Sequence, residues 1–156
     1  MDDVLDYIQP TISAEANDAL FRPCTREEVD YGLAPMHPHK APGFDGTNPF
    51  FFQRFWDTIG DDVSAAVLSI LHRHPIPPVL NSTFVALIPK KQKPEWIFEF
   101  HPISLCDVVY KLITKVIANR LKLLLPNIIS NTQVSFVQGR LISDNILIAF
   151  EIMHTI

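Results

Sequence analysis

A loop that contains lysine and glycine is the segment whose residue types best fit a chemical role. From Lys40 to Gly46 it reads KAPGFDG. Glycine lets backbone amides approach a phosphate closely, and the Lys40 ammonium adds positive charge. However, the spacing differs from that of a P-loop, and no strand is expected before the loop. The residues alone therefore favour a plain turn over an ATP site.

Other chemistries lack a complete set of residues. The pairs His37/His39 and His72/His74 have no third ligand at a spacing that suits a metal. Serine, histidine and aspartate all occur, but no segment has the pattern of a nucleophile elbow. No acidic pair lies on an apolar strand, as a metal-dependent nucleotidyl transferase requires. We therefore predict no catalytic residue and no metal ligand in this chain.

Charge is distributed unevenly along the chain. The net charge is −4 over 156 residues, and residues 1–37 hold eight acidic and two basic residues. Residues 73–140 reverse this balance, with nine basic and three acidic residues. A local basic excess suggests a phosphate-bearing partner, and a solvated surface balanced by the acidic segment is an equal alternative. We expect an acidic lead-in with one capped helix over 1–37 and a second region over 38–156.

Composition favours a folded intracellular protein. Hydrophobic residues make up 47% and charged residues 19% of the chain, which excludes a disordered tail. Two cysteines are too few for a disulfide framework, and the acidic start Met1–Asp3 is unlike a signal peptide. No apolar run is long enough for a membrane span. We expect a location in the nucleus or the cytoplasm and no membrane partner.

The hydrophobic pattern predicts an α+β fold that is mostly helical. Thr25–Glu28 has the pattern of a capping box, which predicts a helix to about Met36. A β-branched and aromatic run over 83–88 is the best strand, and a short extended piece follows at 101–104. Further helices are expected at 49–59, from Asp61 to about 71, at 107–125 and from Asp144 onward, with breaks at Gly60 and Pro126.

Six segments, in order, resemble the N-terminal part of a reverse transcriptase from plant-type non-LTR retrotransposons, the long interspersed elements. The resemblance covers roughly residues 8–156 and includes the separations between the segments. The family fold is a right hand of fingers, palm and thumb, and this part corresponds to the fingers and the beginning of the palm. The matching segments are Lys40–Gly46, Phe51–Asp62, Ile76–Lys90, Phe100–Leu105, Tyr110–Asn127 and Gln133–Asn145.

The resemblance implies RNA-templated DNA synthesis as the family role, with an RNA template and an RNA–DNA or DNA primer duplex as partners. In related polymerases a basic residue on the fingers strand and a following arginine grip the nucleotide triphosphate. These roles fall on Lys90 and on His101, whose imidazole lacks the bidentate fork of arginine. Template or nucleic-acid contacts are expected, by resemblance or from the basic surface, at Lys40, Gly43, Lys91, Lys111, Lys115, Lys122, Gln133, Gly139 and Arg140.

The family's catalytic aspartates, which bind two divalent metals, have no counterpart in the sequence. They belong to palm motifs downstream of the Gly139–Arg140 segment, and no Tyr-x-Asp-Asp string occurs. We therefore expect a truncated chain that lacks its palm and thumb and is inactive by itself. We expect it to hold no cofactor of its own, since Mg²⁺ would belong to the palm.

Two alternatives stay open. One is a non-catalytic nucleic-acid-binding module that keeps the basic fingers surface. The other is a non-functional remnant with Phe50, Phe51, Phe55 and Trp56 exposed.

Overall fold

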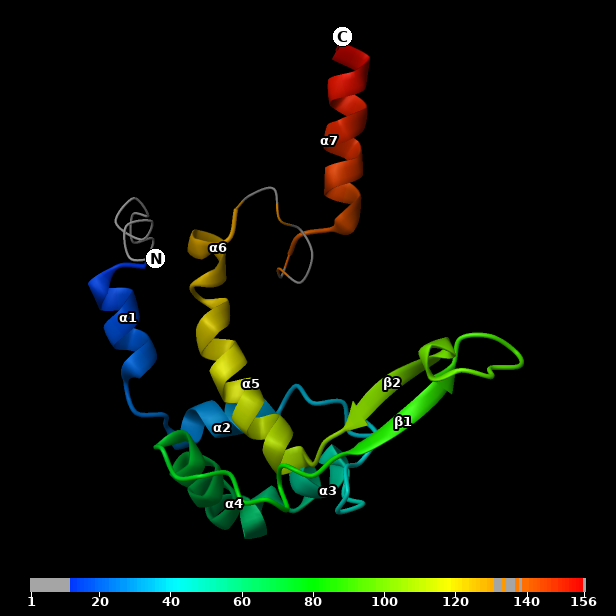
Figure 1. The fold of residues 1–156 in the computed structure, drawn as a ribbon. Coiled ribbons are helices and arrows are strands. Elements are labelled where there is room, and N and C mark those ends of the chain that lie inside the picture. The colour runs from blue at the N-terminus through cyan, green and yellow to red at the C-terminus, as the bar shows by residue number, and fades with distance from the viewer. Residues whose placement is uncertain (1–11, 131–132, 134–136, 138, 156) are drawn as a thin grey trace, which may run out of the picture. The chain divides into compact units, whose positions relative to one another are not determined.

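The computed structural model describes residues 12–130, 133, 137 and 139–155, which fall into two compact units. The central unit is Pro23–Ile117, and the terminal unit holds the described residues on either side of it. About half of the chain is helical, and a two-stranded sheet occurs in the described part (Figure 1). The predicted combination of helices with a little sheet is therefore confirmed.

The elements follow one another in this order: α1 (Ala14–Phe21), α2 (Arg26–Leu33), α3 (Pro49–Arg54), α4 (Trp56–Leu71), β1 (Phe84–Pro89), the 3-10 turn η2 (Ile97–Glu99), β2 (Phe100–Leu105), α5 (Val108–Lys122), α6 (Leu125–Ile128) and α7 (Ile142–Thr155).

Helix α2 begins where the capping box predicts. The carboxylate of Glu28 accepts the backbone N–H of Thr25 at 2.8 Å, which holds the first turn. The helix ends at Leu33 rather than at Met36. Pro35 follows closely, and a proline has no N–H with which to continue the helical hydrogen bonds.

The break between α3 and α4 lies at Phe55, so the predicted break at Gly60 is wrong. Phe55 leaves the helical backbone with φ −108° and ψ 16°, and α4 continues through Gly60. A Cβ on Gly60 would lie 2.8 Å from Nη2 of Arg26 and 3.0 Å from the Trp56 ring. Gly60 therefore allows two side chains to pack closely and does not end a helix.

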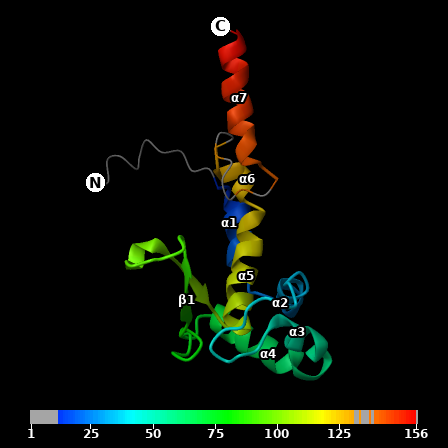
Figure 2. The ribbon, with the colours of Figure 1, turned by 90° about the vertical axis from the view of Figure 1, so that its right-hand side faces the viewer.

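Strands β1 and β2 form an antiparallel hairpin that extends away from α2, α3 and α4 (Figures 1 and 2). The register pairs Phe84 with Leu105 at one end and Pro89 with Phe100 at the other. The two extended segments predicted from the sequence are thus confirmed, and they are partners of each other. Both faces of the hairpin are largely exposed.

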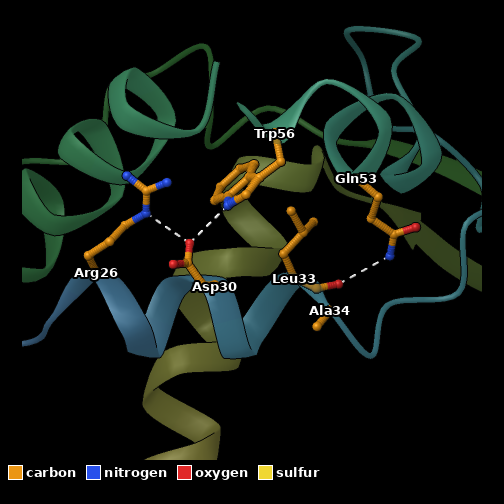
Figure 3. A pocket seen from close by; sticks show the side chains of 6 residues that line it. All are labelled: Arg26, Asp30, Leu33, Ala34, Gln53 and Trp56. Atoms are coloured by element: carbon orange, nitrogen blue, oxygen red, sulfur yellow. Dashed lines mark hydrogen bonds and ion pairs between the residues drawn. The ribbon is translucent and has the colours of Figure 1, made fainter. Parts of the chain in front are cut away.

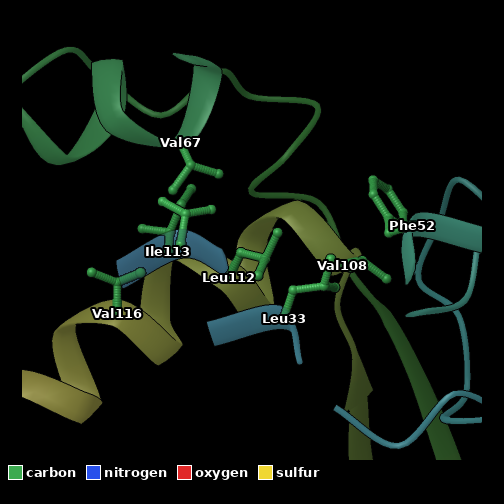
Figure 4. Close-up of a cluster of buried hydrophobic side chains, with 8 residues drawn as sticks. Leu33, Phe52, Val67, Val108, Leu112, Ile113 and Val116 are labelled. Carbon is green, nitrogen blue, oxygen red and sulfur yellow. The ribbon is translucent and has the colours of Figure 1, made fainter. Parts of the chain in front are cut away.

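The core of the central unit joins α2, α4 and α5 (Figure 4). Leu112 and Val116 of α5 are buried in one cluster with Val29 and Leu33 of α2 and with Val67 of α4. The two residues of each pair on α2 and α5 are four positions apart and so lie on one helix face, as the apolar pattern predicts. This core holds the start of α5 in place, and the candidate site depends on that position.

The aromatic run of α3 divides between the core and the surface. Phe52 is buried, whereas Phe50, Phe51 and Phe55 are exposed. Pro49 and Phe52 lie three residues apart on one face of α3, and both are buried. The buried position of Phe52 could not be predicted from the sequence, because neighbouring phenylalanines do not reveal which one faces the core.

The terminal unit contains α1, the last residues of α5, α6 and α7. Arg120 donates to the backbone carbonyl of Leu20 at 2.9 Å and thereby ties α5 to the end of α1. Helix α5 ends at Lys122, before the predicted stop at Pro126, and that proline lies in the first turn of α6. Helix α7 begins at Ile142, two residues before the predicted start.

Candidate nucleic-acid interface

The Lys40–Gly46 loop is fixed against the junction between β2 and α5. Gly43 is buried, and a Cβ built on it would lie 2.1 Å from Asp107 Oδ1, 2.4 Å from the Asp107 nitrogen and 2.5 Å from the Cys106 carbonyl carbon. No side chain fits at this distance. Gly43 therefore serves a contact between two backbones, and the loop is not held open around a ligand.

Asp107 provides a second attachment for the same loop. Asp107 is 3% exposed, and its Oδ1 accepts the backbone N–H of Asp45 at 3.2 Å. Next to it, the rings of Phe44 and Phe84 pack with centroids 5.1 Å apart. In the sequence, the one signal for this role is the position of Asp107 at the predicted start of a helix, where an acidic residue is a favoured cap.

Lys111, on the first turn of α5, provides the third attachment. Its Nζ donates to the carbonyl of Ala41 at 2.9 Å. Burial and the neighbouring positive charge of Lys40 lower the pKa of Lys111. The hydrogen bond to Ala41, the residue after Lys40, places Lys111 beside the loop that carries Lys40.

Lys40, Lys111 and Lys115 form what we name the loop–helix lysine cluster. Lys115 follows Lys111 by four residues, so the two side chains share one side of α5. Within the described residues, none of the three lysines has an ion pair with a carboxylate. An accumulation of positive charge without paired carboxylates is the electrostatic arrangement that binds phosphates.

Lys90 and His101, the predicted nucleotide contacts, lie on the same face of the hairpin. The register pairs Ile88 with His101, and the Lys90 N–H donates to the Glu99 carbonyl at 2.8 Å. Alternation along the strands then places the Lys90 and His101 side chains diagonally on one face. However, the Lys90 ammonium donates to the Phe98 carbonyl at 2.9 Å, so one of its N–H groups is already used within the hairpin loop.

Lys91 is likewise engaged within the hairpin. Its ammonium forms an ion pair with Glu99, whose other oxygen accepts the backbone N–H groups of Glu95 and Trp96. The ion pair with Lys91 and these backbone hydrogen bonds lower the pKa of Glu99. Glu99 thus holds both ends of the loop that joins β1 to β2.

We expect this loop to open at acid pH. Because the folded-state pKa of Glu99 is lowered, its stabilising effect is complete above the ordinary carboxyl range and is lost as the pH falls through the folded-state value. Trp96 fluorescence should report the change. Glu99→Gln should show the acid-type spectrum already at neutral pH, and Glu95→Gln, whose side chain holds no such contacts, serves as the control. An identical acid transition in Glu99→Gln would contradict the assignment.

The C-terminal candidates belong to the terminal unit. Arg140 donates to the carbonyls of Ser130 and Gln133, at 2.6 Å each. Gly139 has a φ of 83°, a left-handed conformation that favours glycine, and so turns the chain into Arg140. Lys122, at the end of α5, is exposed. Arg140 therefore binds two backbone carbonyls of the terminal unit, a role that its sequence position alone did not predict.

A shallow pocket of about 520 Å³ lies between α2 and the α3–α4 region (Figure 3). Its polar groups bind one another. Asp30 Oδ1 accepts from Arg26 Nε at 2.8 Å and from Trp56 Nε1 at 2.9 Å, and Gln53 donates to the Met36 carbonyl at 2.8 Å. We interpret this pocket as the joint between helices, because Trp56 of α4 donates to Asp30 of α2 beside it.

Metal binding and membrane insertion are two further properties to consider for the described residues. No group of three or more histidine, cysteine, aspartate or glutamate side chains is placed to hold a metal ion there. None of the helices in this part of the chain is both long enough and apolar enough to cross a membrane.

Comparison with known proteins relates the chain to mobile elements. No protein-family model matches it. Over 145 residues, which are 93% of the chain, it is 33% identical to the transposon TX1 uncharacterized 149 kDa protein of Xenopus laevis. The chain spans 11% of the length of that relative. The similarity supports a retrotransposon-related protein.

Proposed function

We propose that the chain is a fingers-like segment of a non-LTR retrotransposon reverse transcriptase and that it binds the template–primer duplex. Two lines of support come from the sequence. Six motifs occur in the family's order, and the similarity to the transposon TX1 protein extends over 93% of the chain. The plant-type assignment rests on the motifs alone.

The loop–helix lysine cluster is the observation that carries this proposal. Its position is rigid, because Lys111 anchors the loop through Ala41 and α5 is anchored through the core. Lys40 and Lys115 have no carboxylate partner among the described residues. Phosphates of a nucleic acid would supply the missing negative charge and would release counterions on binding. Sequence-independent contact with the backbone is the expected mode.

Catalysis is not part of the proposed role of these residues. We propose that Lys90 and His101 contact the nucleotide triphosphate only once a palm and thumb complete the site. His101 offers a weaker grip than arginine, because an imidazole lacks the bidentate fork of a guanidinium. We therefore expect the chain alone to make no DNA when it is given template, primer, nucleotides and Mg²⁺.

Salt dependence of binding tests the proposal. A fluorescently labelled RNA–DNA duplex is titrated with the chain between 50 and 200 mM salt, and anisotropy gives the apparent Kd. Three lysine–phosphate contacts predict that log K falls with log salt with a slope of about −2 to −3. Affinity that does not change with salt, the absence of binding at 50 mM salt, or DNA synthesis by the pure chain would contradict it.

A further inference from the structure

The two edges of the β hairpin are chemically different. The Lys90 N–H donates to the Glu99 carbonyl, which marks this pair as hydrogen-bonded. In an antiparallel ladder such pairs alternate, so Ile88–His101 and Ala86–Ile103 are also hydrogen-bonded pairs. The intervening residues of β1, Val85 and Leu87, therefore direct their N–H and C=O groups away from β2. In the described part of the chain no other strand pairs with β1.

The outer edge of β2 is blocked at its centre. By the same alternation, the backbone groups that point away from β1 are those of Phe100, Pro102 and Ser104. Pro102 has no N–H and cannot donate to a further strand. The sheet can therefore grow along β1 and is closed to growth along β2.

The free edge of β1 is complementary to itself. When two copies of β1 run antiparallel about a two-fold axis at Ala86, Val85 of each copy lies opposite Leu87 of the other. Each such pair exchanges two hydrogen bonds, which satisfies all the outward groups of Val85 and Leu87. A shift by two residues in one direction would place the nitrogen of Pro89, which has no hydrogen, opposite Val85. The opposite shift would pair Leu87 with Thr83, which precedes β1, so the two-fold register at Ala86 keeps its hydrogen-bonded pairs within the strand.

The side chains also suit this register. Phe84 of one copy lies opposite Ile88 of the other, and these side chains are 52% and 48% exposed. An aromatic residue beside a β-branched one is a favourable cross-strand pair. The strand, FVALIP, contains no charged residue, so no like charges meet. An uncharged, exposed edge is the kind that associates with another strand.

We propose that β1 is a homodimerisation edge: it pairs antiparallel with β1 of a second copy of this chain. The result is a continuous four-stranded sheet in the order β2, β1, β1, β2. A hairpin of two strands is marginal by itself, and four strands bury more of its apolar side chains. A closed two-fold arrangement limits the association to a dimer, because Pro102 blocks both outer edges of the new sheet. The proposal does not depend on nucleic-acid binding.

Two matched proline variants test the proposal by sedimentation over a range of protein concentrations. Leu87→Pro removes an outward N–H of β1 and leaves the hydrogen bonds to β2 intact, while Ser104→Pro makes the same change on the blocked edge of β2. The wild-type chain and Ser104→Pro should dimerise, and Leu87→Pro should weaken the dimer at least tenfold. A wild-type chain that stays monomeric would overturn the proposal. The edge of β1 would then be available to a strand of another polypeptide. A dimer that Leu87→Pro leaves unchanged would also overturn the proposal.

A crosslink tests the same register without relying on the fold of a proline variant. In the proposed dimer the two Ala86 residues form a non-hydrogen-bonded pair, whose Cα atoms lie roughly 4.5 Å apart and within disulfide range. With Cys24 and Cys106 changed to serine, Ala86→Cys should oxidise to a covalent dimer. Ser104→Cys in the same background should stay monomeric. Equal crosslinking in both variants, or in neither, would overturn the register.

Discussion

Replacing Gly43 with alanine is expected to lower the free energy of unfolding by about 3 kcal/mol, the upper part of the range for overpacking. The added Cβ would lie within 2.1–2.5 Å of three atoms of Cys106 and Asp107, two of which belong to the backbone. Because a backbone cannot rotate aside as a side chain can, the loop must leave its contact with the start of α5. Urea denaturation followed by circular dichroism measures the change.

Gly46→Ala is the matched control for this loop. Gly46 has a φ of 70°, but no atom lies within 4 Å of a Cβ built on it. Only the left-handed backbone then opposes alanine, at a cost of roughly 1 kcal/mol. Equal losses for the two variants would mean that the close approach of Gly43 to Asp107 is not what fixes the loop.

Leu112→Ala is expected to destabilise the chain by about 3 kcal/mol, through lost burial and the cavity that remains. Leu112 is 0% exposed and belongs to the cluster that joins α2, α4 and α5. The loss should also loosen Lys111, its neighbour in the chain, and so weaken the proposed nucleic-acid contact. Thermal and urea unfolding measure the first effect, and duplex binding measures the second.

Leu123→Ala supplies the comparison for Leu112→Ala. Leu123 is 78% exposed, so the same truncation should change stability by less than roughly 0.5 kcal/mol. If Leu112→Ala were as mild as Leu123→Ala, the cluster around α5 would not be the core of the central unit.

Local signals in the sequence predicted much of the fold. The Thr25–Glu28 capping box, the strand at 83–88 and the long helix after residue 107 are all present, because each follows from neighbouring residues. The predicted helix break at Gly60 was wrong because the role of Gly60 depends on a residue that is distant in the sequence. Its role depends on Arg26, which lies 34 positions earlier in the chain, and no local rule reports such a contact.

The candidate site could be predicted only in part. Charge along the sequence identified the lysines, yet it did not show that Lys111 holds the Ala41 carbonyl or that Lys91 pairs with Glu99. The contact of Asp107 could not be predicted, because its partner, the Asp45 amide, is 62 residues away in the chain. Sequence thus suggested which residues carry charge, and the fold decides which charges are used within the chain.

The central claim is that the loop–helix lysine cluster contacts nucleic-acid phosphates. The most direct test measures the salt dependence of duplex binding for the double variant Lys40→Glu/Lys115→Glu, in which Lys111 keeps its structural hydrogen bond. We predict that the slope of log K against log salt becomes shallower by about 2 and that affinity at low salt falls at least tenfold. Lys93→Glu, on the exposed hairpin loop, should change the slope by less than about 0.5. A double variant with the wild-type slope, or a Lys93→Glu variant with an equal loss, would contradict the account.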